Sequence, residues 1–447
     1  MSLALELAKR INALHYEDLS PEAVHWAKVG ILDTIGVTLA GSSDPCASIV
    51  AGVLSSSGQS LLLGTSRRAS ILDAALVNGA ASHALDFDDC NNTMAGHPSA
   101  PVLSALFALA DDVGASGSDF IVAYVAGFET ECKISLGVFG AAAACAKLLQ
   151  LDEQRTATAL AIAASLSSGI KSNFGTYVKP LHVGHSARNG LFAALIARDD
   201  YTASPVAFEH KQGYFEVFNG AGNYDAEKIL PAWGSPFDIV KPGIGIKQYP
   251  CCASTHPAID AMLKLVRMHD VTPDAVERIQ SWTHKRRLEH TNRPDPQSTK
   301  DAKFSVQYCL ARALLDRKVV IEHFEGDAYK DVDARKLTAL VEAGVYDTDQ
   351  FPAENHFGAE VKVTLRGGTV LGQKVESAAG RTSADPLPAD RLKDKFENCA
   401  RRALSSERTA AVYAAIQDFD RLADVRAVTA AMTAEAAPRR LDTAARV

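Results

Sequence analysis

Alanine, leucine and isoleucine recur at intervals of three and four residues from the N-terminus to about residue 245. This spacing gathers apolar side chains on one face of a helix, so the first half of the chain is predicted to be all-α. One helix is expected to begin near Ser99, with Pro101 in its first turn, and another is expected to begin at Asp152 and Glu153.

The pattern changes after residue 250. Strands are predicted at 277–284 and, as a hairpin, at 359–375, with a helix at 301–316 between them. Helical periodicity returns at 391–432. The predicted fold is therefore mostly α, with a helical domain, a smaller α+β domain and C-terminal helices that pack back on the helical domain. The expected boundaries are 1–250, 251–386 and 387–447.

Charge and cysteine usage exclude several classes of protein. The net charge is -7, with both signs mixed along the chain, which gives no basic surface for nucleic acid or an anionic membrane. The first residues lack the pattern of a signal peptide, and no uncharged run is apolar enough to span a bilayer. The eight cysteines are scattered, which is typical of reduced thiols in a cytoplasm. We expect a cytoplasmic protein without nucleic-acid or membrane partners.

The segment HALDFDDCNNTMAGHP, residues 83–98, concentrates Asp86, Asp88 and Asp89 ahead of His97. Clustered carboxylates can bind Mg²⁺, but such helical enzymes need a second acidic cluster, and the sequence has none. A metal-free acid/base site fits better, with His97 as the base and Asp86 orienting it or balancing its charge. Asp88 and Asp89 could equally be solvated or capping residues.

The segment GTYVKPLHVGHSARNG, residues 175–190, carries Lys179 directly before a proline. A residue in that position is biased away from helix, so Lys179 is expected in a loop, as a counter-ion for a substrate carboxylate or as a base. His182 follows as a candidate for substrate binding, although a lone histidine is more often structural.

Lys247 and His256 lie at the expected domain junction, where ligand pockets commonly form. Cys251, Cys252 and His256 could be zinc ligands, but adjacent cysteines point different ways and no fourth ligand is evident, so buried thiols are favoured. Tyr308 lies in the predicted helix of the second domain, where a core tyrosine is the alternative. The lysines and histidines together imply a small anionic substrate.

In this order, LDFDD with GHPSAPVL, KPLHVG, YPCCASTHPAID and KFSVQYCLARALLD resemble the MmgE/PrpD family. The resemblance covers nearly the whole chain and implies a helical domain plus an α+β domain, an active site between them, a homodimer and no cofactor. It supports Asp86, His97, Lys179, Lys247 and Tyr308 as site residues. We expect catalytic roles for Asp86, His97, Lys179 and Tyr308, substrate binding by Lys247, His182 and His256, and no metal ligands.

The family includes 2-methylcitrate dehydratase, cis-aconitate decarboxylase and iminodisuccinate epimerase, which implies proton removal next to a carboxylate of a small di- or tricarboxylate. Two departures stand out. Cys90 occupies a position where citrate-type and aconitate-type members tend to have threonine, and a segment with a histidine is missing near 133–137.

The first departure favours an iminodisuccinate-type epimerase, with His97 and Asp86 serving one face of the substrate carbon and Lys179 or Tyr308 the other. The alternatives are a 2-methylcitrate dehydratase-like or cis-aconitate decarboxylase-like lyase, and a ligand-binding homologue that has lost catalysis.

Overall fold

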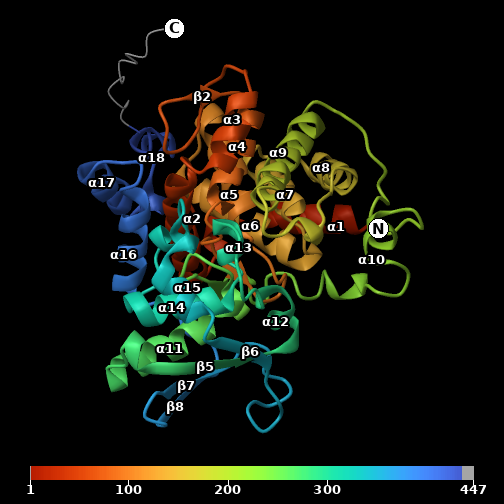
Figure 1. Ribbon diagram of the computed structural model, residues 1–447. Helices are drawn as coiled ribbons and strands as arrows, with labels where there is room; N and C mark the ends of the chain where they lie inside the picture. The colour runs from red at the N-terminus through yellow and green to blue at the C-terminus, as the bar shows by residue number, and fades with distance from the viewer. Residues whose placement is uncertain (1, 435–447) are drawn as a thin grey trace, which may run out of the picture.

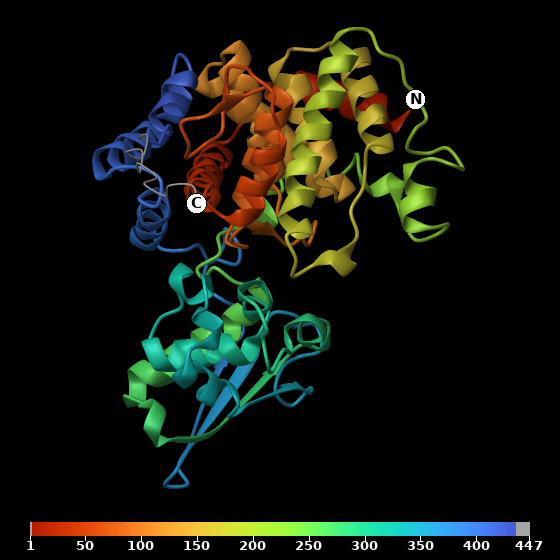
Figure 2. The ribbon, with the colours of Figure 1, turned by 45° about the horizontal axis from the view of Figure 1, so that its top comes forward.

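Two large hydrophobic cores divide the computed structural model, which describes residues 2–434. One core joins helices from residues 3–246 with helices from 387–432, and we call these segments the helical region. The other core lies within residues 249–375, which we call the α+β region. Figures 1 and 2 show the sheet at one end of the molecule and the long helices at the other. The predicted fold class is confirmed.

The helical region is built from long helices that cover one another closely. Its helices are α1 (Leu3–Ala13), α2 (Pro21–Gly41), α3 (Pro45–Val53), α4 (Ile71–His83), α5 (Ser99–Val113), α6 (Gly117–Ile134), α7 (Gly137–Leu148), α8 (Glu153–Ser165), α9 (Val178–Arg198) and α10 (Tyr214–Asn219). As expected, Asp152 caps α8 by accepting the Arg155 amide. None of the described helices is both long and apolar enough to cross a lipid bilayer.

Helices α4 and α9 carry much of the candidate site, and glycines let them approach closely. A Cβ atom placed on Gly79 of α4 would lie 2.5 Å from the Cα atom of Gly184 of α9, so no side chain fits at this crossing. The close contact brings the C-terminal end of α4 beside the first turn of α9.

The α+β region contains a four-stranded sheet of order β6-β5-β7-β8. Strands β7 (Ala359–Leu365) and β8 (Val370–Val375) form the predicted antiparallel hairpin, and β5 (Val276–Thr283) corresponds to the predicted strand at 277–284. The antiparallel pairing of β5 with β7, and the strand β6 (Val341–Val345) that pairs parallel to β5, were not predicted. Its helices are α11 (His256–His269), α12 (Lys285–Thr291), α13 (Thr299–Ala302), α14 (Val306–Asp316) and α15 (Val332–Thr338).

The helix predicted at 301–316 is broken. Helix α13 ends at Ala302, and α14 begins at Val306 because the Ser305 hydroxyl accepts the Tyr308 amide as an N-cap. The break leaves Lys303 outside both helices.

The chain returns to the helical region at its C-terminal end. Helices α16 (Ala389–Ala400), α17 (Ser406–Gln417) and α18 (Arg426–Ala431) lie along one side of that region (Figure 2). The α16 residue Phe396 packs against Gly36 of α2. The predicted return of the C-terminal helices is therefore confirmed as far as residue 434, and residues 435–447 of that prediction lie outside the described part of the chain.

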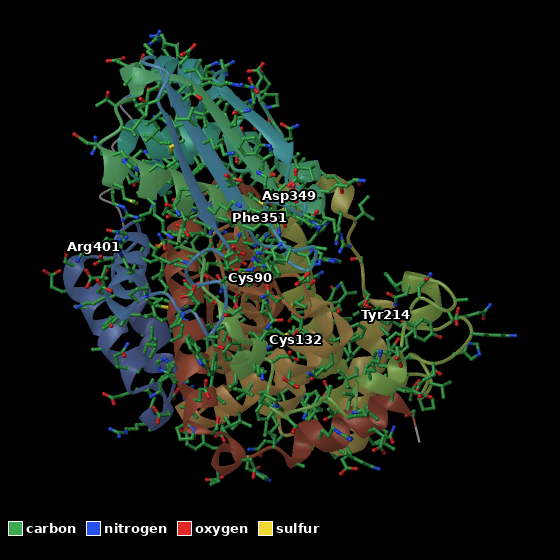
Figure 3. The ribbon with its side chains drawn as sticks, turned by 90° about the horizontal axis from the view of Figure 1, so that it is seen from below. Cys90, Cys132, Tyr214, Asp349, Phe351 and Arg401 are labelled. Carbon is green, nitrogen blue, oxygen red and sulfur yellow. The ribbon has the colours of Figure 1, made fainter. Side chains whose placement is uncertain are left out.

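A small third core joins the two regions. Within the helical region, strand β3 (Cys90–Asn91) pairs with β4 (Ile244–Gly245), and β1 (Ser60–Leu61) pairs with β2 (Arg68–Ala69). Figure 3 shows Cys90 where the two regions meet. In the third core, Leu85 and Phe87 of the helical region pack with Ile321 of the α+β region. The segment around residue 86 therefore lies at the junction.

Candidate active site

The turn after α4 is the centre of the candidate site. Asp86 adopts a left-handed backbone conformation there, with φ 53°. This conformation is uncommon for residues with a side chain, although aspartate tolerates it better than most. The Lys247 ammonium holds the turn by donating to the carbonyl oxygen of Asp86 (2.7 Å) and to its carboxylate Oδ1 (3.0 Å).

Four consecutive carbonyl oxygens of this turn, at residues 84–87, each accept a hydrogen bond from a different lysine. Each bond is 2.7 Å long, and the pairs are Lys300 with Ala84, Lys303 with Leu85, Lys247 with Asp86 and Lys395 with Phe87. Buried backbone carbonyls outside regular secondary structure need hydrogen-bond donors, and the ammonium groups supply them. Lysines from both regions therefore fix one turn.

The Asp86 carboxylate is buried among cations. Its Oδ1 atom lies 2.6 Å from Lys179 Nζ and 3.0 Å from Lys247 Nζ. Burial alone would raise the pKa of the Asp86 carboxyl, but these two ammonium groups hold it well below its usual value. The second oxygen, Oδ2, is buried without a hydrogen-bond partner among the described residues. The carboxylate is therefore charged, with one oxygen still able to accept a hydrogen bond.

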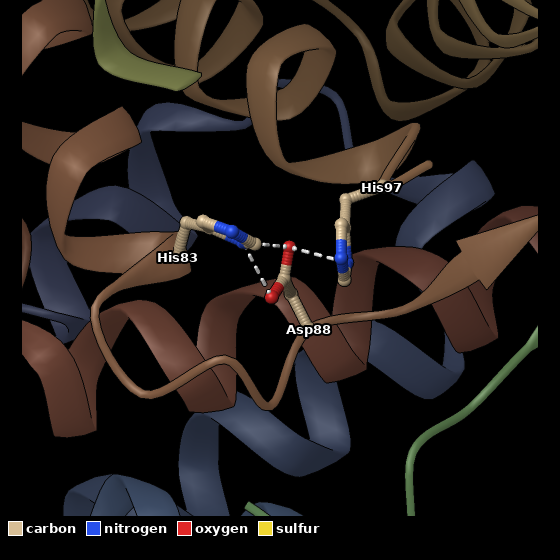
Figure 4. A group of neighbouring side chains, drawn as sticks. All are labelled: His83, Asp88 and His97. Carbon is tan, nitrogen blue, oxygen red and sulfur yellow. Dashed lines mark hydrogen bonds and ion pairs between the residues drawn. The ribbon is translucent and has the colours of Figure 1, made fainter. Parts of the chain in front are cut away.

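Two imidazole rings share the carboxylate of Asp88 (Figure 4). His83 Nδ1 lies 2.8 Å from Asp88 Oδ1, and His97 Nδ1 lies 3.3 Å from Oδ2. His97 Nδ1 also lies 2.7 Å from the Asp89 carbonyl, which can only accept, so this nitrogen carries a hydrogen. The Nε2 atoms of His83 and His97 lie 4.0 Å and 3.9 Å from Asp86 Oδ1. Each Nε2 atom is therefore left to exchange protons.

The two rings differ in access. The His97 side chain is 21% exposed, whereas that of His83 is 2% exposed. Burial lowers the pKa of His83 to about 3, although Asp88 opposes the shift, so the ring stays neutral near pH 7. His97 is therefore the more accessible of the two rings, while His83 helps to hold Asp88.

A narrow pocket lies beside Asp86, between the two regions. Its lining includes His83, Asp86 and Lys179 from the helical region and Lys300, Lys303 and Phe304 from the α+β region. Its volume is about 20 Å³, which is enough for about one water molecule. A substrate can enter only if residues of the two regions separate.

Family models match both regions of the chain. Residues 5–227 match the MmgE/PrpD N-terminal domain, and residues 249–420 match the MmgE/PrpD C-terminal domain. The chain belongs to the MmgE/PrpD family. The resemblance inferred from the four sequence segments is confirmed.

Curated relatives match the chain over nearly its whole length. The cis-aconitate decarboxylase of Homo sapiens is 28% identical, over 98% of this chain and 96% of the relative. That of Mus musculus is 27% identical, over 96% and 93%, and that of Aspergillus terreus is 25% identical, over 94% and 94%. These MmgE/PrpD relatives support the predicted lyase alternative and give no support to the epimerase reading.

The MmgE/PrpD segment KPLHVG does not form a loop. Lys179 is the second residue of α9, so the predicted loop is wrong. Pro180 does not prevent the helix, because a proline in the first turn lacks only an amide that would have no intrahelical acceptor. The helix brings Lys179 to Asp86, as the site prediction requires.

Asp86 does not orient His97 as one part of the prediction expected, because the Asp88 carboxylate and the Asp89 carbonyl contact its Nδ1 atom. Asp86 Oδ1 lies 3.9 Å from His97 Nε2, within ion-pair distance, which agrees with the alternative that Asp86 balances the charge of the ring. Neither Asp88 nor Asp89 is solvated, since both side chains are fully buried. Asp89 does bond the Ser99 amide at 3.3 Å near the start of α5, which agrees with the capping alternative.

Two predicted site residues lie in the core of the α+β region instead. The Tyr308 hydroxyl donates to the His323 carbonyl (2.6 Å) and accepts from Arg312 Nε (3.0 Å). The ring of His256 is buried, with Nε2 3.2 Å from the Cys251 carbonyl. The structure brings neither residue into contact with Asp86, because internal hydrogen bonds hold both side chains.

His182 lies on α9, one turn after Lys179, and its ring has no hydrogen-bond partner among the described residues. Partial burial lowers its pKa. It does not line the pocket beside Asp86. Substrate binding by His182 stays a prediction.

Two residues of the site were missed in the sequence, His83 and Lys303. His83 ends a helix and Lys303 precedes one, and both positions are ordinary for a histidine and a lysine. Their only signal was position, since Lys303 begins the family segment KFSVQYCLARALLD and His83 lies two residues before the family segment LDFDD.

The structure shows the surroundings of the two departures from the family pattern, Cys90 and the short connection near 133–137. Cys90 is buried, and its Sγ atom accepts from Arg381 Nη1 at 3.6 Å. Helices α6 and α7 are joined by only Ser135 and Leu136, where the extra segment of relatives was expected to be missing.

Proposed function

We propose that this chain is a lyase that decarboxylates a small unsaturated tricarboxylate of the cis-aconitate type. The observation that carries the proposal is the pocket at the junction, which Lys179, Lys300 and Lys303 line together with Asp86. His97 Nε2 lies 3.9 Å from the Oδ1 atom of that Asp86. A substrate with several carboxylates needs such a cationic lining. The similarity to cis-aconitate decarboxylases over nearly the whole chain supports the same reaction.

The chemistry required is the loss of CO₂ from the carboxylate on the methylene carbon. The electron pair of the breaking C–C bond forms a new double bond to the central carbon. The electrons of the old double bond move onto the carbon next to the remaining terminal carboxylate, and a proton joins that carbon. The products are CO₂ and methylenesuccinate. The enzyme must therefore supply one proton and stabilise negative charge that develops on a carboxylate.

His97 is the proposed proton donor. Its Nδ1–H group is bonded to the Asp89 carbonyl, which fixes the ring so that Nε2 is the atom that delivers a proton to the substrate carbon. Lys179 is the proposed cation for the carboxylate on which charge develops. Asp86 pairs with both Lys179 and Lys247 and so holds these side chains in position.

The test is to incubate the purified protein with cis-aconitate in heavy water and to follow the reaction by proton NMR and CO₂ release. The proposal predicts methylenesuccinate with one deuterium on its saturated carbon. Parallel incubations contain 2-methylcitrate and iminodisuccinate. Loss of water from 2-methylcitrate would indicate the dehydratase, and deuterium exchange in iminodisuccinate without CO₂ would indicate the epimerase.

The variant His97→Gln tests the proposed proton donor, because glutamine keeps a polar side chain of similar length without a titratable nitrogen. His97→Gln should abolish most CO₂ release. If wild-type protein binds these acids but converts none, the ligand-binding alternative is supported and the proposed reaction is wrong.

A further inference from the structure

Lys303 is a buried lysine that forms no ion pair with the described residues. The residue is 3% exposed, and its Nζ atom donates to the Leu85 carbonyl at 2.7 Å. No carboxylate of the described residues lies within ion-pair distance of Nζ. A buried ammonium without a counter-ion is unfavourable, because burial removes water from the charge without replacing it with an opposite charge.

The other buried lysines of the turn differ in this respect. Lys247 pairs with Asp86 at 3.0 Å, and Lys395 pairs with Asp33 at 2.6 Å. Lys247, Lys303 and Lys395 all donate to a carbonyl of the same turn. The need to hold the turn therefore does not explain why, among the described residues, Lys303 has no ion-pair partner while the other two have one. Lys303 also lines the pocket beside Asp86, whereas Lys395 does not.

We propose that Lys303 binds one carboxylate of the substrate from the α+β side of the pocket, facing Lys179 on the helical side. This inference rests on the proposed function for its substrate class, a small tricarboxylate. The substrate then provides the anion that the fold omits, and its binding draws the α+β region onto the helical region. A carboxylate held by two lysines from different regions binds only when the regions close.

The electrostatic surroundings make this contact pH-dependent. Burial, and then the neighbouring Lys300, lower the pKa of Lys303 to about 7, although nearby acidic groups oppose the shift. The titratable groups that face it are Lys300 of α13, Asp86 of the turn, Asp44 before α3 and Cys251. Lys303 is cationic below about pH 7 and neutral above it, so its contribution to anion binding should be lost as the pH rises through 7.

The experiment measures binding of propane-1,2,3-tricarboxylate, a saturated and unreactive tricarboxylate, by titration calorimetry at pH 6.5 and 8.5. Lys303→Met should raise Kd at pH 6.5 by about 10- to 100-fold, the effect of one charge-assisted hydrogen bond. The ratio of mutant to wild-type Kd should shrink at pH 8.5. In buffers of different ionisation enthalpy at pH 8, wild type should take up a proton on binding, because the carboxylate restores the ammonium, and the variant should not.

Two further variants separate binding from structural support. Lys303→Arg, which stays charged at every pH used, should bind well at both pH values and show no proton uptake. Lys395→Met, which removes a lysine with the same kind of carbonyl contact, should lower Tm but keep the pH dependence of wild type. The inference would be overturned by equal Kd values for wild type and Lys303→Met at pH 6.5, or by equal proton uptake in these two proteins at pH 8. It would also be overturned if wild type did not bind the tricarboxylate. Binding without turnover would instead overturn only the proposed decarboxylation.

Discussion

The turn at 84–89 and the core around Tyr308 both bury polar side chains from MmgE/PrpD segments, yet they differ in how those groups are satisfied. The Tyr308 hydroxyl has partners on both sides, and the His256 ring bonds a carbonyl. At the turn, Asp86 Oδ2 has no partner among the described residues, and Lys303 has no counter-ion there. Unsatisfied buried groups cost stability, so a fold keeps them where a ligand completes them. In these two places, the groups around Tyr308 are completed within the fold, whereas the turn leaves an oxygen and an ammonium group that a ligand can complete.

The largest effect is expected from Asp86→Asn. The change removes the anion that two buried ammonium groups share, so both lysines lose their partner and the left-handed turn loses a contact. We expect kcat/KM for cis-aconitate to fall by on the order of 10³-fold. The matched control is Asp33→Asn, which breaks a buried lysine–aspartate pair outside the pocket. Asp33→Asn should lower the urea midpoint, while its kcat/KM should change far less than that of Asp86→Asn. Equal losses of activity in the two variants would contradict the distinction between a buried pair in the site and a buried pair in the scaffold.

Lys179→Met should have the next largest effect, a fall of about 10²-fold in kcat/KM. Methionine keeps the apolar stem, and Asp86 keeps Lys247, so Tm should change little. Lys171→Met, in the exposed 3₁₀ turn Lys171–Asn173 that precedes α9, is the control and should behave as wild type. A Lys179→Met protein with full kcat/KM would place the chemistry elsewhere.

The sequence predicted the features that depend on local pattern. Apolar periodicity identified the long helices, and alternation identified β5 and the β7–β8 hairpin. Strand β6 was missed because VEAGV does not alternate, and its pairing with β5 comes from the fold around it. The break at Lys303 depends on a single capping serine inside an otherwise helical pattern.

The site was predicted in part for a similar reason. Asp86, Lys179 and Lys247 are brought together as expected. The prediction was possible because the order of the segments that carry them matches the family. Which acid orients His97 could not be predicted, because Asp86 and Asp88 are two residues apart and only the turn geometry decides between them. The roles expected for Tyr308 and His256 depended on the resemblance alone, and their hydrogen bonds in the core were visible only in three dimensions.

Tyr308→Phe should affect stability and leave activity nearly unchanged. The change removes a hydroxyl that bonds the His323 carbonyl and Arg312, and both partners are buried. We expect a loss of about 1–3 kcal/mol in the free energy of unfolding, measured with urea, and kcat/KM within about threefold of wild type. Tyr201→Phe, at an exposed position, is the control. A 10²-fold loss of activity at unchanged stability would restore Tyr308 to the active site.

The smallest expected effect is that of EDTA, which should leave kcat/KM unchanged after dialysis. His83, Asp88 and His97 do offer three ligand atoms within 4.8 Å of one another, so this group is the place where a metal ion would bind among the described residues. The Nδ1–H of His83 is directed at Asp88 and that of His97 at Asp88 and the Asp89 carbonyl, so an ion would have to replace hydrogens that already satisfy the carboxylate. The ammonium groups around Asp86 oppose a further cation nearby. Loss of activity with EDTA, restored by one equivalent of a metal measured in the protein, would mean that an ion binds His83, Asp88 and His97, and that His97 does not deliver the proton.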